Sequence, residues 1–391
     1  MQALCTDTYQ TNELLSELIS IASVNPNLSR NGTGEYKIAS FLQSYLQQMG
    51  LEVHFQKISD QQANVVGVWK GTGGGKSLML NGHLDTVGVE GMEISPFDPV
   101  LDKGKMFGRG AIDMKSGVCA QIMAVKLLMD TGISLAGDVI ISCVADEEHM
   151  SKGTFKLLDS FTADAAIVTE PTDLGIVLAH KGFVWQKIRV IGRAAHGSKP
   201  DLGVDAIMKA GNILCAIHDF EEQELKKRVH PLLGRASVHA STIEGGTEMS
   251  IYPDKCVLEL ERRTLPGEYI EHVHAETENI LNELRKRDPQ LQVELSSYLE
   301  RLPLEVDPEH PIVKSLSKSH KRKLGAAPFQ GVTFWTDAAL ISQKGIPTVI
   351  FGPSGGGLHA AIEYVEMESV YQTAEILAHT LLDYCGTEED I

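Results

Sequence analysis

The chain has 391 residues, of which 43% are hydrophobic, and its net charge is −17. A chain of this length usually forms two domains, and its apolar content is enough to fill two cores. The negative charge comes without any block of lysine or arginine, which argues against nucleic acid or an anionic membrane as a partner, because either would require a basic patch.

The first half of the chain predicts strands that alternate with helices. Helix-period patterns cover residues 10–22 and 34–48, and apolar runs predict strands at 51–58, 64–70, 77–82, 138–145 and 165–169. Between the third and fourth strands, Val118, Ile122, Val125 and Met129 share one face of a helix that stops at Gly132. Strands that are apolar nearly throughout indicate an α/β fold with a mixed, mostly parallel sheet covered by helices.

The loop "KGTGGGKS" at residues 70–77 is rich in glycine but does not fit a phosphate-binding loop. The GxxxxGK[ST] pattern needs a glycine where Lys70 stands, and the loop leads into a strand instead of a helix. We expect a hairpin turn here.

The pattern changes near residue 182. The run "WQKIRVIG" alternates, with Ile188 and Val190 against Lys187 and Arg189, and the next predicted elements are a helix, two strands, a helix and a strand. This order is that of a ferredoxin-like α+β unit. From about residue 305 the α/β pattern resumes and ends in a helix near 366–384. We expect one domain from residues 1–181 and 299–391, and an inserted domain from 182–298.

The sequence offers no sign of export or membrane insertion. The first 20 residues have no basic segment followed by an apolar one, and no apolar stretch approaches the roughly 18 residues of a membrane span. The six cysteines are scattered without a CxxC pair, which suits reduced thiols. We expect a cytoplasmic protein that acts on a small molecule and binds neither nucleic acid nor membrane.

Acidic residues and histidines follow the predicted strands or open the next element. They are His83 and Asp85 in "GHLDTV", Asp113 in "GRGAIDMKSG", Glu147 and Glu148 in "DEEH", Glu170 in "TEPT" and His359 in "GLHAAIEYV". The carboxyl ends of parallel strands converge on one crevice, where so many unpaired carboxylates would repel one another. Divalent cations would remove this repulsion.

Histidine and carboxylate ligands together suit zinc, with cobalt or manganese as substitutes. His83 and Asp85 point to the same face of an extended chain, so Asp85 can orient the His83 ring. Each residue also has an ordinary structural explanation: Asp113 could cap its helix, Glu170 could belong to a turn, and "DEE" could be a solvated loop. The joint pattern favours the metal site.

The chain resembles the acetylornithine deacetylase and succinyl-diaminopimelate desuccinylase family of di-zinc amidohydrolases, which includes aminoacylases and glutamate carboxypeptidases. The resemblance spans most of the chain, because "GHLDTV", "GRGAIDMKSG", "DEE", "EPT", "HKGF", "GRAAHGSKP", "RRTLPGE", "TDAAL", "GIPTVIFGP" and "HAAIEYV" occur in the family's order. It implies that His83 and Glu170 hold one zinc ion, that Glu148 and His359 hold the other, and that Asp113 bridges the two.

The resemblance also implies roles outside the ligand set. Glu147 is similar to the family's general base and Asp85 to its orienting acid. The inserted domain matches a lid that also carries the dimer contact, so a homodimer is expected. His196 in "AAHGS" matches a histidine that reaches a neighbouring subunit's active site, and Arg263 in "RTLPG" matches an arginine that binds the substrate carboxylate. Ser250 departs from the family, where asparagine is common.

We therefore expect hydrolysis of the amide bond of an N-acyl amino acid or short peptide by a metal-bound hydroxide, with Glu147 as general base and His196 as oxyanion donor. Acetylornithine-type deacylation is the first hypothesis. Desuccinylation and dipeptidase or carboxypeptidase activity on the same site are the alternatives, and a non-catalytic metal-binding protein is a remote one.

Overall fold

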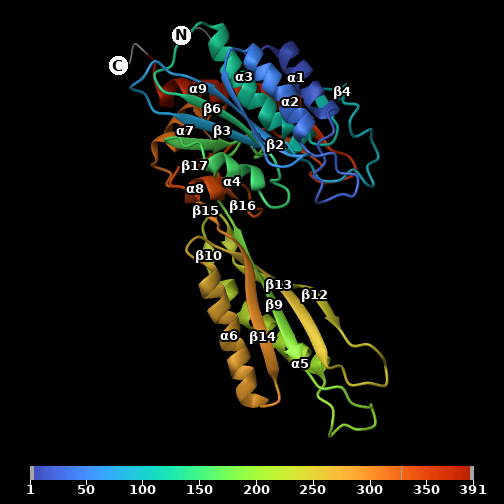
Figure 1. Ribbon diagram of the computed structural model, residues 1–391. Coiled ribbons are helices and arrows are strands. Elements are labelled where there is room, and N and C mark those ends of the chain that lie inside the picture. The colour runs from blue at the N-terminus through green and yellow to red at the C-terminus, as the bar shows by residue number, and fades with distance from the viewer. Residues whose placement is uncertain (1–3, 327, 388–391) are drawn as a thin grey trace. The chain divides into compact units, whose positions relative to one another are not determined.

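The computed structural model describes residues 4–326 and 328–387 and divides into two compact units (Figure 1). Unit 1 contains the described residues up to Leu178, then Val306–Gln330, and those from Thr336 onward. Unit 2 contains Ala179–Glu305 and the short segment Gly331–Trp335. The sequence pattern placed the two main divisions at residues 181/182 and 298/299, and it did not predict the return of the chain to unit 2 at Gly331.

Unit 1 is built on one mixed sheet. Its strands, in spatial order, are β1 (Glu52–Lys57), β2 (Ala63–Trp69), β6 (Val139–Val144), β3 (Leu78–His83), β7 (Ala165–Val168), β17 (Thr348–Ile350) and β8 (Ile176–His180). The four central strands β6, β3, β7 and β17 are parallel, whereas β1, β2 and β8 run antiparallel to their neighbours. The predicted mixed, mostly parallel α/β sheet is therefore confirmed.

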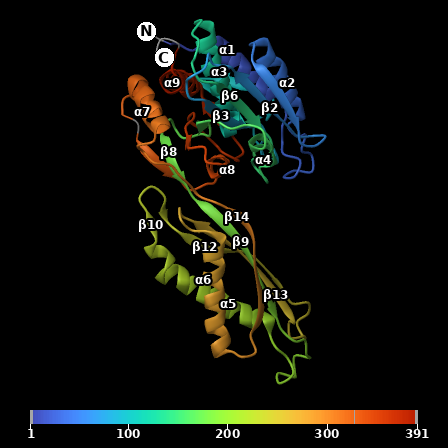
Figure 2. The same cartoon turned by 60° about the vertical axis from the view of Figure 1, so that its left-hand side comes forward.

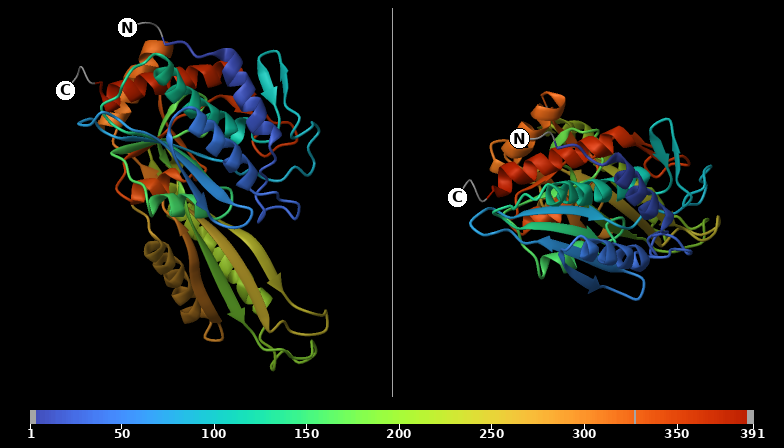
Figure 3. Two further views of the ribbon diagram at one scale, coloured as in Figure 1. Left: turned by 45° about the horizontal axis from the view of Figure 1, so that its top comes forward. Right: turned by 90° about the horizontal axis from the view of Figure 1, so that it is seen from above.

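Helices cover both faces of this sheet. They are α1 (Thr8–Ser20), α2 (Tyr36–Gln48), α3 (Ser116–Asp130), α4 (Lys152–Leu158), α7 (Pro311–Leu324), α8 (Ala338–Gln343) and α9 (Met367–Cys385), with the short π-helix η1 (Ala111–Lys115) before α3. In Figure 1, α3 and α9 lie above the sheet and α4 and α8 below it, and Figure 3 shows α3 and α9 side by side. Every residue of β3 and β6 is buried, as expected for strands covered on both faces. No helix within the described residues is long and apolar enough to cross a membrane.

The loop at residues 70–77 does not form the hairpin turn that its glycines suggested. β2 and β3, which it connects, lie on opposite sides of β6 and each pair with β6. The prediction was wrong because a glycine-rich composition indicates only that the chain turns. It does not show whether another strand, here β6, lies between the two strands that the loop connects.

A second, small sheet of unit 1 was not predicted. Its order is β18 (Gly355–Gly356), β19 (Tyr364–Glu366), β5 (Lys105–Phe107) and β4 (Val100–Asp102). Strands of two or three residues are too short for an alternating pattern to be recognised in the sequence. This sheet brings the segment after β17 beside the segment before η1.

Unit 2 is the predicted ferredoxin-like unit (Figure 2). Its sheet order is β12 (Ser237–Gly245), β13 (Lys255–Thr264), β9 (Gly182–Ile191) and β14 (Gln292–Arg301), all antiparallel, with α5 (Ala206–Gln223) and α6 (Ile270–Arg287) packed on one face. The core between the helices and the sheet includes Ile188, Ile213, Leu258 and Leu281. The shorter elements are η2 (Leu225–Lys227), β10 (Val229–His230), β11 (Gly234–Arg235) and β15 (Leu304–Glu305), and β16 (Phe329–Val332) pairs with β8.

Candidate metal centre

The predicted ligands lie at the carboxyl ends of the four central strands of unit 1. His83 is the last residue of β3, Glu147 and Glu148 follow β6, Glu170 follows β7, His359 lies in the loop after β17, and Asp113 lies in η1. Because these strands are parallel neighbours, their ends meet at one edge of the sheet, where open α/β sheets bind ligands. The topology thus gathers residues as far apart in the chain as His83 and His359.

Asp113 lies between the two histidines. Its Oδ1 is 3.1 Å from Nε2 of His83, and its Oδ2 is 3.1 Å from Nε2 of His359. Glu170 Oε1 lies 3.5 Å from the same His83 nitrogen, and Glu148 Oε1 lies 3.2 Å from the same His359 nitrogen. These contacts define two groups, called here the His83 group (His83, Asp113, Glu170) and the His359 group (Asp113, Glu148, His359).

Each group can hold a metal ion. The ligand atoms of each lie within 4.8 Å of one another, and the two groups share Asp113. One imidazole nitrogen and two carboxylates leave a coordination position open, which is the arrangement of catalytic zinc sites. The donor set therefore fits a pair of divalent cations bridged by one aspartate.

The charges in this cluster disturb one another strongly. Burial raises the pKa of the Glu170 carboxyl to about 8 and also raises the pKa of Glu148. Hydrogen bonds to Asp113 and then to Glu148 raise the pKa of His359 to about 10. Burial alone would lower the pKa of His83, but the charge of Glu170 and the hydrogen bond to Asp113 outweigh it and raise that pKa well above its usual value. Without metal, protons therefore bind to the side chains that would otherwise bind cations.

The His83 ring is oriented from behind by Asp85. Nδ1 of His83 lies 2.9 Å from the backbone carbonyl oxygen of Asp85 and 3.6 Å from its carboxylate oxygen Oδ1. The nearer acceptor is thus the carbonyl oxygen, whereas the sequence led us to expect the carboxylate. A proton on Nδ1 that is donated to this oxygen leaves the lone pair of Nε2 directed at the ligand group.

The Asp85 carboxylate itself holds the backbone of the acidic segment. It accepts the N–H groups of Glu147 and Glu148, each at 3.1 Å, and the side-chain amide of Asn25 at 2.8 Å. Burial raises the pKa of the Glu147 carboxyl well above its usual value, which makes its carboxylate a stronger base.

A buried polar network behind Asp85 was not predicted from the sequence. The Asn25 amide also donates to Asp146 at 3.1 Å, and Gln62 donates to Asp146 at 3.3 Å and to Glu35 at 3.2 Å. Asp146 is fully buried. Asn25, Glu35 and Gln62 stand in no recognisable motif, so the sequence holds no signal that would have identified them.

Three further buried residues near the ligands belong to sequence motifs that we had recognised, but we had assigned no function to them. Asp337 of "TDAAL" accepts a hydrogen bond from Thr154, and burial raises its pKa to about 6. Glu363 of "HAAIE" pairs with Arg109 of "GRGAID" at 2.7 Å. For Glu363 and Arg109, the signal that could have identified them is their placement four residues from His359 and Asp113, respectively.

The two remaining predicted site residues belong to unit 2. His196 is exposed, and its Nδ1 accepts the N–H of Ser198 at 3.2 Å, which places the proton of a neutral ring on Nε2. The Arg263 guanidinium donates to the carbonyl oxygen of Thr333 and lies 5.4 Å from the ring centre of Phe183. The structure does not bring either residue together with the ligand groups within one unit.

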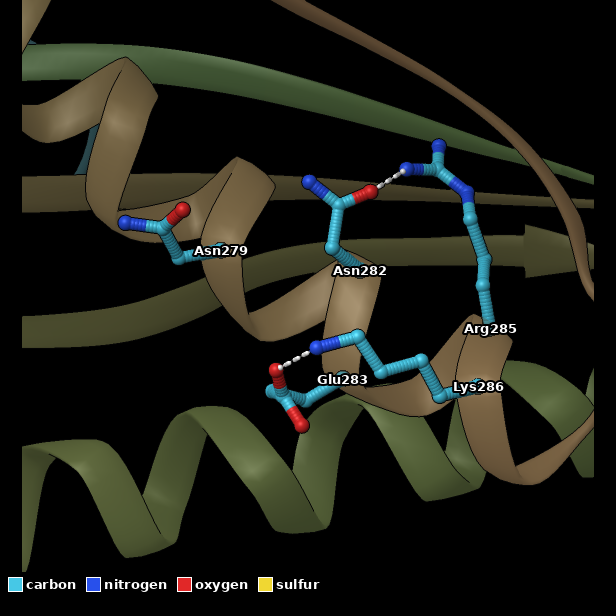
Figure 4. A pocket seen from close by; sticks show the side chains of 5 residues that line it. All are labelled: Asn279, Asn282, Glu283, Arg285 and Lys286. Atoms are coloured by element: carbon cyan, nitrogen blue, oxygen red, sulfur yellow. Dashed lines mark hydrogen bonds and ion pairs between the residues drawn. The ribbon is translucent and has the colours of Figure 1, made fainter.

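A hollow on the surface of α6 is chemically different from the ligand cluster (Figure 4). It is lined by Asn279, Asn282, Glu283, Arg285 and Lys286. Lys286 pairs with Glu283 at 2.5 Å and Arg285 pairs with Glu278 at 2.6 Å, so each charged group of the lining has a partner of opposite charge. Neither the histidines nor the carboxylates of the two ligand groups line it.

Comparison with known proteins identifies relatives along nearly the whole chain. The family model described as peptidase family M20/M25/M40 matches residues 79–383. N-formyl-4-amino-5-aminomethyl-2-methylpyrimidine deformylase of Bacillus subtilis (strain 168) is 30% identical, over 97% of this chain and 95% of that protein. Acetylornithine deacetylase of Myxococcus xanthus is 27% identical, over 95% of this chain and 97% of that protein.

Among solved structures, aminopeptidase PepT from Bacillus cereus ATCC 10987 aligns with a TM-score of 0.81 and 19% identity, and covers 97% of this chain and 99% of that chain. At this level of identity the likeness shows the fold.

Proposed function

The chain belongs to peptidase family M20/M25/M40, and on that premise we propose that it hydrolyses the amide bond of an N-acyl amino acid with two zinc ions, as an acetylornithine deacetylase-like enzyme. Family membership makes it a hydrolytic enzyme that acts on amide bonds. The observation that carries the finer proposal is the Asp113 carboxylate, which faces His83 with one oxygen and His359 with the other.

We assign the His83 group to one metal ion and the His359 group to the second, with Asp113 bridging. Zinc suits this mixture of nitrogen and oxygen ligands, and cobalt or manganese would be substitutes. Bound there, the ions would polarise the amide carbonyl group and lower the pKa of a water molecule toward about 7.

Glu147 is proposed as the general base. It would take a proton from the attacking water and deliver it to the nitrogen of the leaving amine, so that amide and water give a carboxylate and a protonated amine once the second proton of the water has also passed to the amine. The Asp85 carboxylate, which accepts the N–H groups of Glu147 and Glu148, would keep the base and the neighbouring ligand in fixed positions. The raised pKa of Glu147 supports this role, because a stronger base takes the proton more readily.

Arg263 and His196 are proposed to contact the substrate. The planar guanidinium of Arg263 is suited to a free carboxylate, which N-acyl amino acids carry. A proton on Nε2 of His196, with Nδ1 engaged by Ser198, leaves an N–H that can donate to the oxyanion formed from the amide.

A second candidate is deformylation of an N-formyl aminomethylpyrimidine, which is favoured by the 30% identity to the Bacillus subtilis deformylase. Deacetylation and deformylation would use the same metal site. The substrates differ in the acyl group, and the amino acid carries a carboxylate that the pyrimidine lacks. Desuccinylation and cleavage of short peptides are further alternatives, and the same experiment tests them.

The discriminating experiment is a substrate panel assayed with zinc, cobalt and manganese. It would contain N-acetyl, N-formyl and N-succinyl amino acids, dipeptides and the N-formyl aminomethylpyrimidine. We expect the highest kcat/KM on an N-acetyl amino acid, and loss of that preference in Arg263→Ala. A preference for the formylated pyrimidine would replace the first candidate by the second.

We further propose a homodimer formed through unit 2. β12 is one of the two edge strands of its sheet, and His239–Gly245 of this strand are exposed. Exposed apolar side chains of unit 2 include Leu202, Met208, Ile243 and Met249. An exposed edge strand with apolar neighbours is a ready surface for pairing with another chain. Light scattering after gel filtration would show whether the mass is that of one chain or two.

A further inference from the structure

The carboxylate of Glu363 is fully buried and accepts four hydrogen bonds. Its Oε2 accepts from Arg109 Nη1 at 2.7 Å and from the N–H of Gly110 at 3.0 Å. Its Oε1 accepts from the N–H groups of Ile112 at 3.0 Å and Asp113 at 3.2 Å. One side chain therefore binds the backbone of the segment that presents the shared ligand Asp113.

Glu363 also connects this segment to His359. It lies four residues after His359, and its partner Arg109 donates through Nη2 to the carbonyl oxygen of Ala360 at 3.3 Å. The same guanidinium donates through Nε to the carbonyl oxygen of Gly88 at 3.1 Å. His359 has a backbone φ of +58°, which a residue with a side chain adopts only when neighbouring contacts hold it there.

We propose that Glu363, together with Arg109, is a positioning residue that holds Asp113 and His359 in the geometry in which the His359 group binds its metal ion. This inference rests on the proposed function, because it requires that the His359 group is a metal site. Glu363 touches neither the substrate nor the ligand atoms themselves, and it acts through the backbone on which Asp113 and His359 stand.

The negative charge of Glu363 is essential to this role. An ionised carboxylate offers acceptors on both oxygens, and here each oxygen receives two donors. A glutamine would keep one acceptor oxygen and turn an NH₂ group toward two donors. It would also leave the Arg109 guanidinium, which is 3% exposed, without its counter-ion.

The test compares Glu363→Gln with a matched control, Glu375→Gln. Glu375 is likewise a buried carboxylate of unit 1 that accepts a backbone N–H, from Thr6 at 3.0 Å, and pairs with a cation, Lys323. Zinc binding to the full chain would be measured by equilibrium dialysis at buffered free zinc, with metal counted per chain. The absorption spectrum of the cobalt-loaded protein would report the ligand geometry independently of activity.

For Glu363→Gln we expect one ion to bind about 10- to 100-fold more weakly than in the wild type, as for other residues that orient ligands. We expect Glu375→Gln to keep wild-type affinities for both ions. Wild-type zinc affinities in Glu363→Gln, or an equal loss in both variants, would overturn the proposal. If Glu363→Gln fails to fold, Arg109→Lys takes its place, and unchanged zinc affinities in that variant would overturn it equally.

The wild-type control separates this inference from the proposed function. A wild type that binds two ions but cleaves none of the substrate panel contradicts the proposed reaction and leaves the test of Glu363 intact. A wild type that binds no ion contradicts both.

Discussion

The Oδ1 atom of Asp85 accepts the backbone N–H of Glu147 at 3.1 Å, and this bond fixes the residue proposed as general base from a position behind the ligand cluster. The other carboxylate oxygen of Asp85 accepts from Glu148 and Asn25. Asp85 therefore positions the base, one ligand segment and, through its carbonyl oxygen, the His83 ring.

Asp85→Asn should test this positioning role. The amide would turn an NH₂ group toward N–H donors, so we expect kcat/KM and zinc affinity each to fall by about 10- to 100-fold. Asp138→Asn is the matched control, because Asp138 lies directly before β6 and accepts the N–H of Gly71 at 2.9 Å. Steady-state kinetics and metal counting on both variants check the prediction, and equal losses in the two would contradict it.

Glu147→Gln should separate the base from the ligands. We expect both metal ions to stay bound while kcat falls by at least about 100-fold, the usual contribution of a general base. Glu148→Gln is the comparison, since it should lose the ion of the His359 group. Metal content and kcat are measured on the same preparations. Near wild-type kcat in a fully loaded Glu147→Gln protein would remove Glu147 from the mechanism.

Metal binding should release protons. The pKa of His359 is raised to about 10 by its hydrogen bonds to Asp113 and Glu148, so the ring is protonated at neutral pH and must lose that proton to become a ligand. Protons and zinc compete for the same ligand atoms, and lowering the pH favours the protons. For each proton released on binding, the apparent zinc affinity should therefore fall by about tenfold per unit decrease in pH. Calorimetric titrations between pH 6 and 8, in buffers of different ionisation enthalpy, would measure the release. An affinity independent of pH would refute this prediction.

His196 should act across the proposed dimer. His196→Ala and Glu147→Gln proteins should each be nearly inactive. Mixed and re-equilibrated, they should recover up to about a quarter of wild-type activity, because half of the dimers would be mixed and each would hold one complete site. Native mass spectrometry of the mixture, with one of the two variants carrying an affinity tag, shows whether mixed dimers have formed and so controls for subunit exchange. Absence of recovery despite exchange would place His196 within its own subunit's site or outside catalysis.

Much of the fold and of the ligand cluster was predictable because both follow from local patterns and one topological rule. β3, β6 and β7 are mostly apolar and buried throughout, and ligands that follow such strands must meet when the strands are parallel neighbours. The same rule applied to His359, although its loop after β17 is longer.

The supporting network could not be predicted because it depends on contacts between distant segments. Arg109 and Glu363 are 254 positions apart, and Asn25 meets Asp146 from 121 positions away. Their positions are fixed by the small sheet of β4, β5, β18 and β19 and by the packing of the loop after α1, which have no periodic signature in the sequence. The order β2-β6-β3 was missed for the same reason.

We propose above all that the His83 group and the His359 group each hold one metal ion and share Asp113. The most direct measurement is anomalous X-ray diffraction at the zinc edge from crystals of the zinc-loaded protein. We expect two peaks that flank the Asp113 carboxylate, one beside His83 and Glu170 and the other beside Glu148 and His359. Zinc bound elsewhere in fully loaded crystals, with no peak at Asp113, would contradict it.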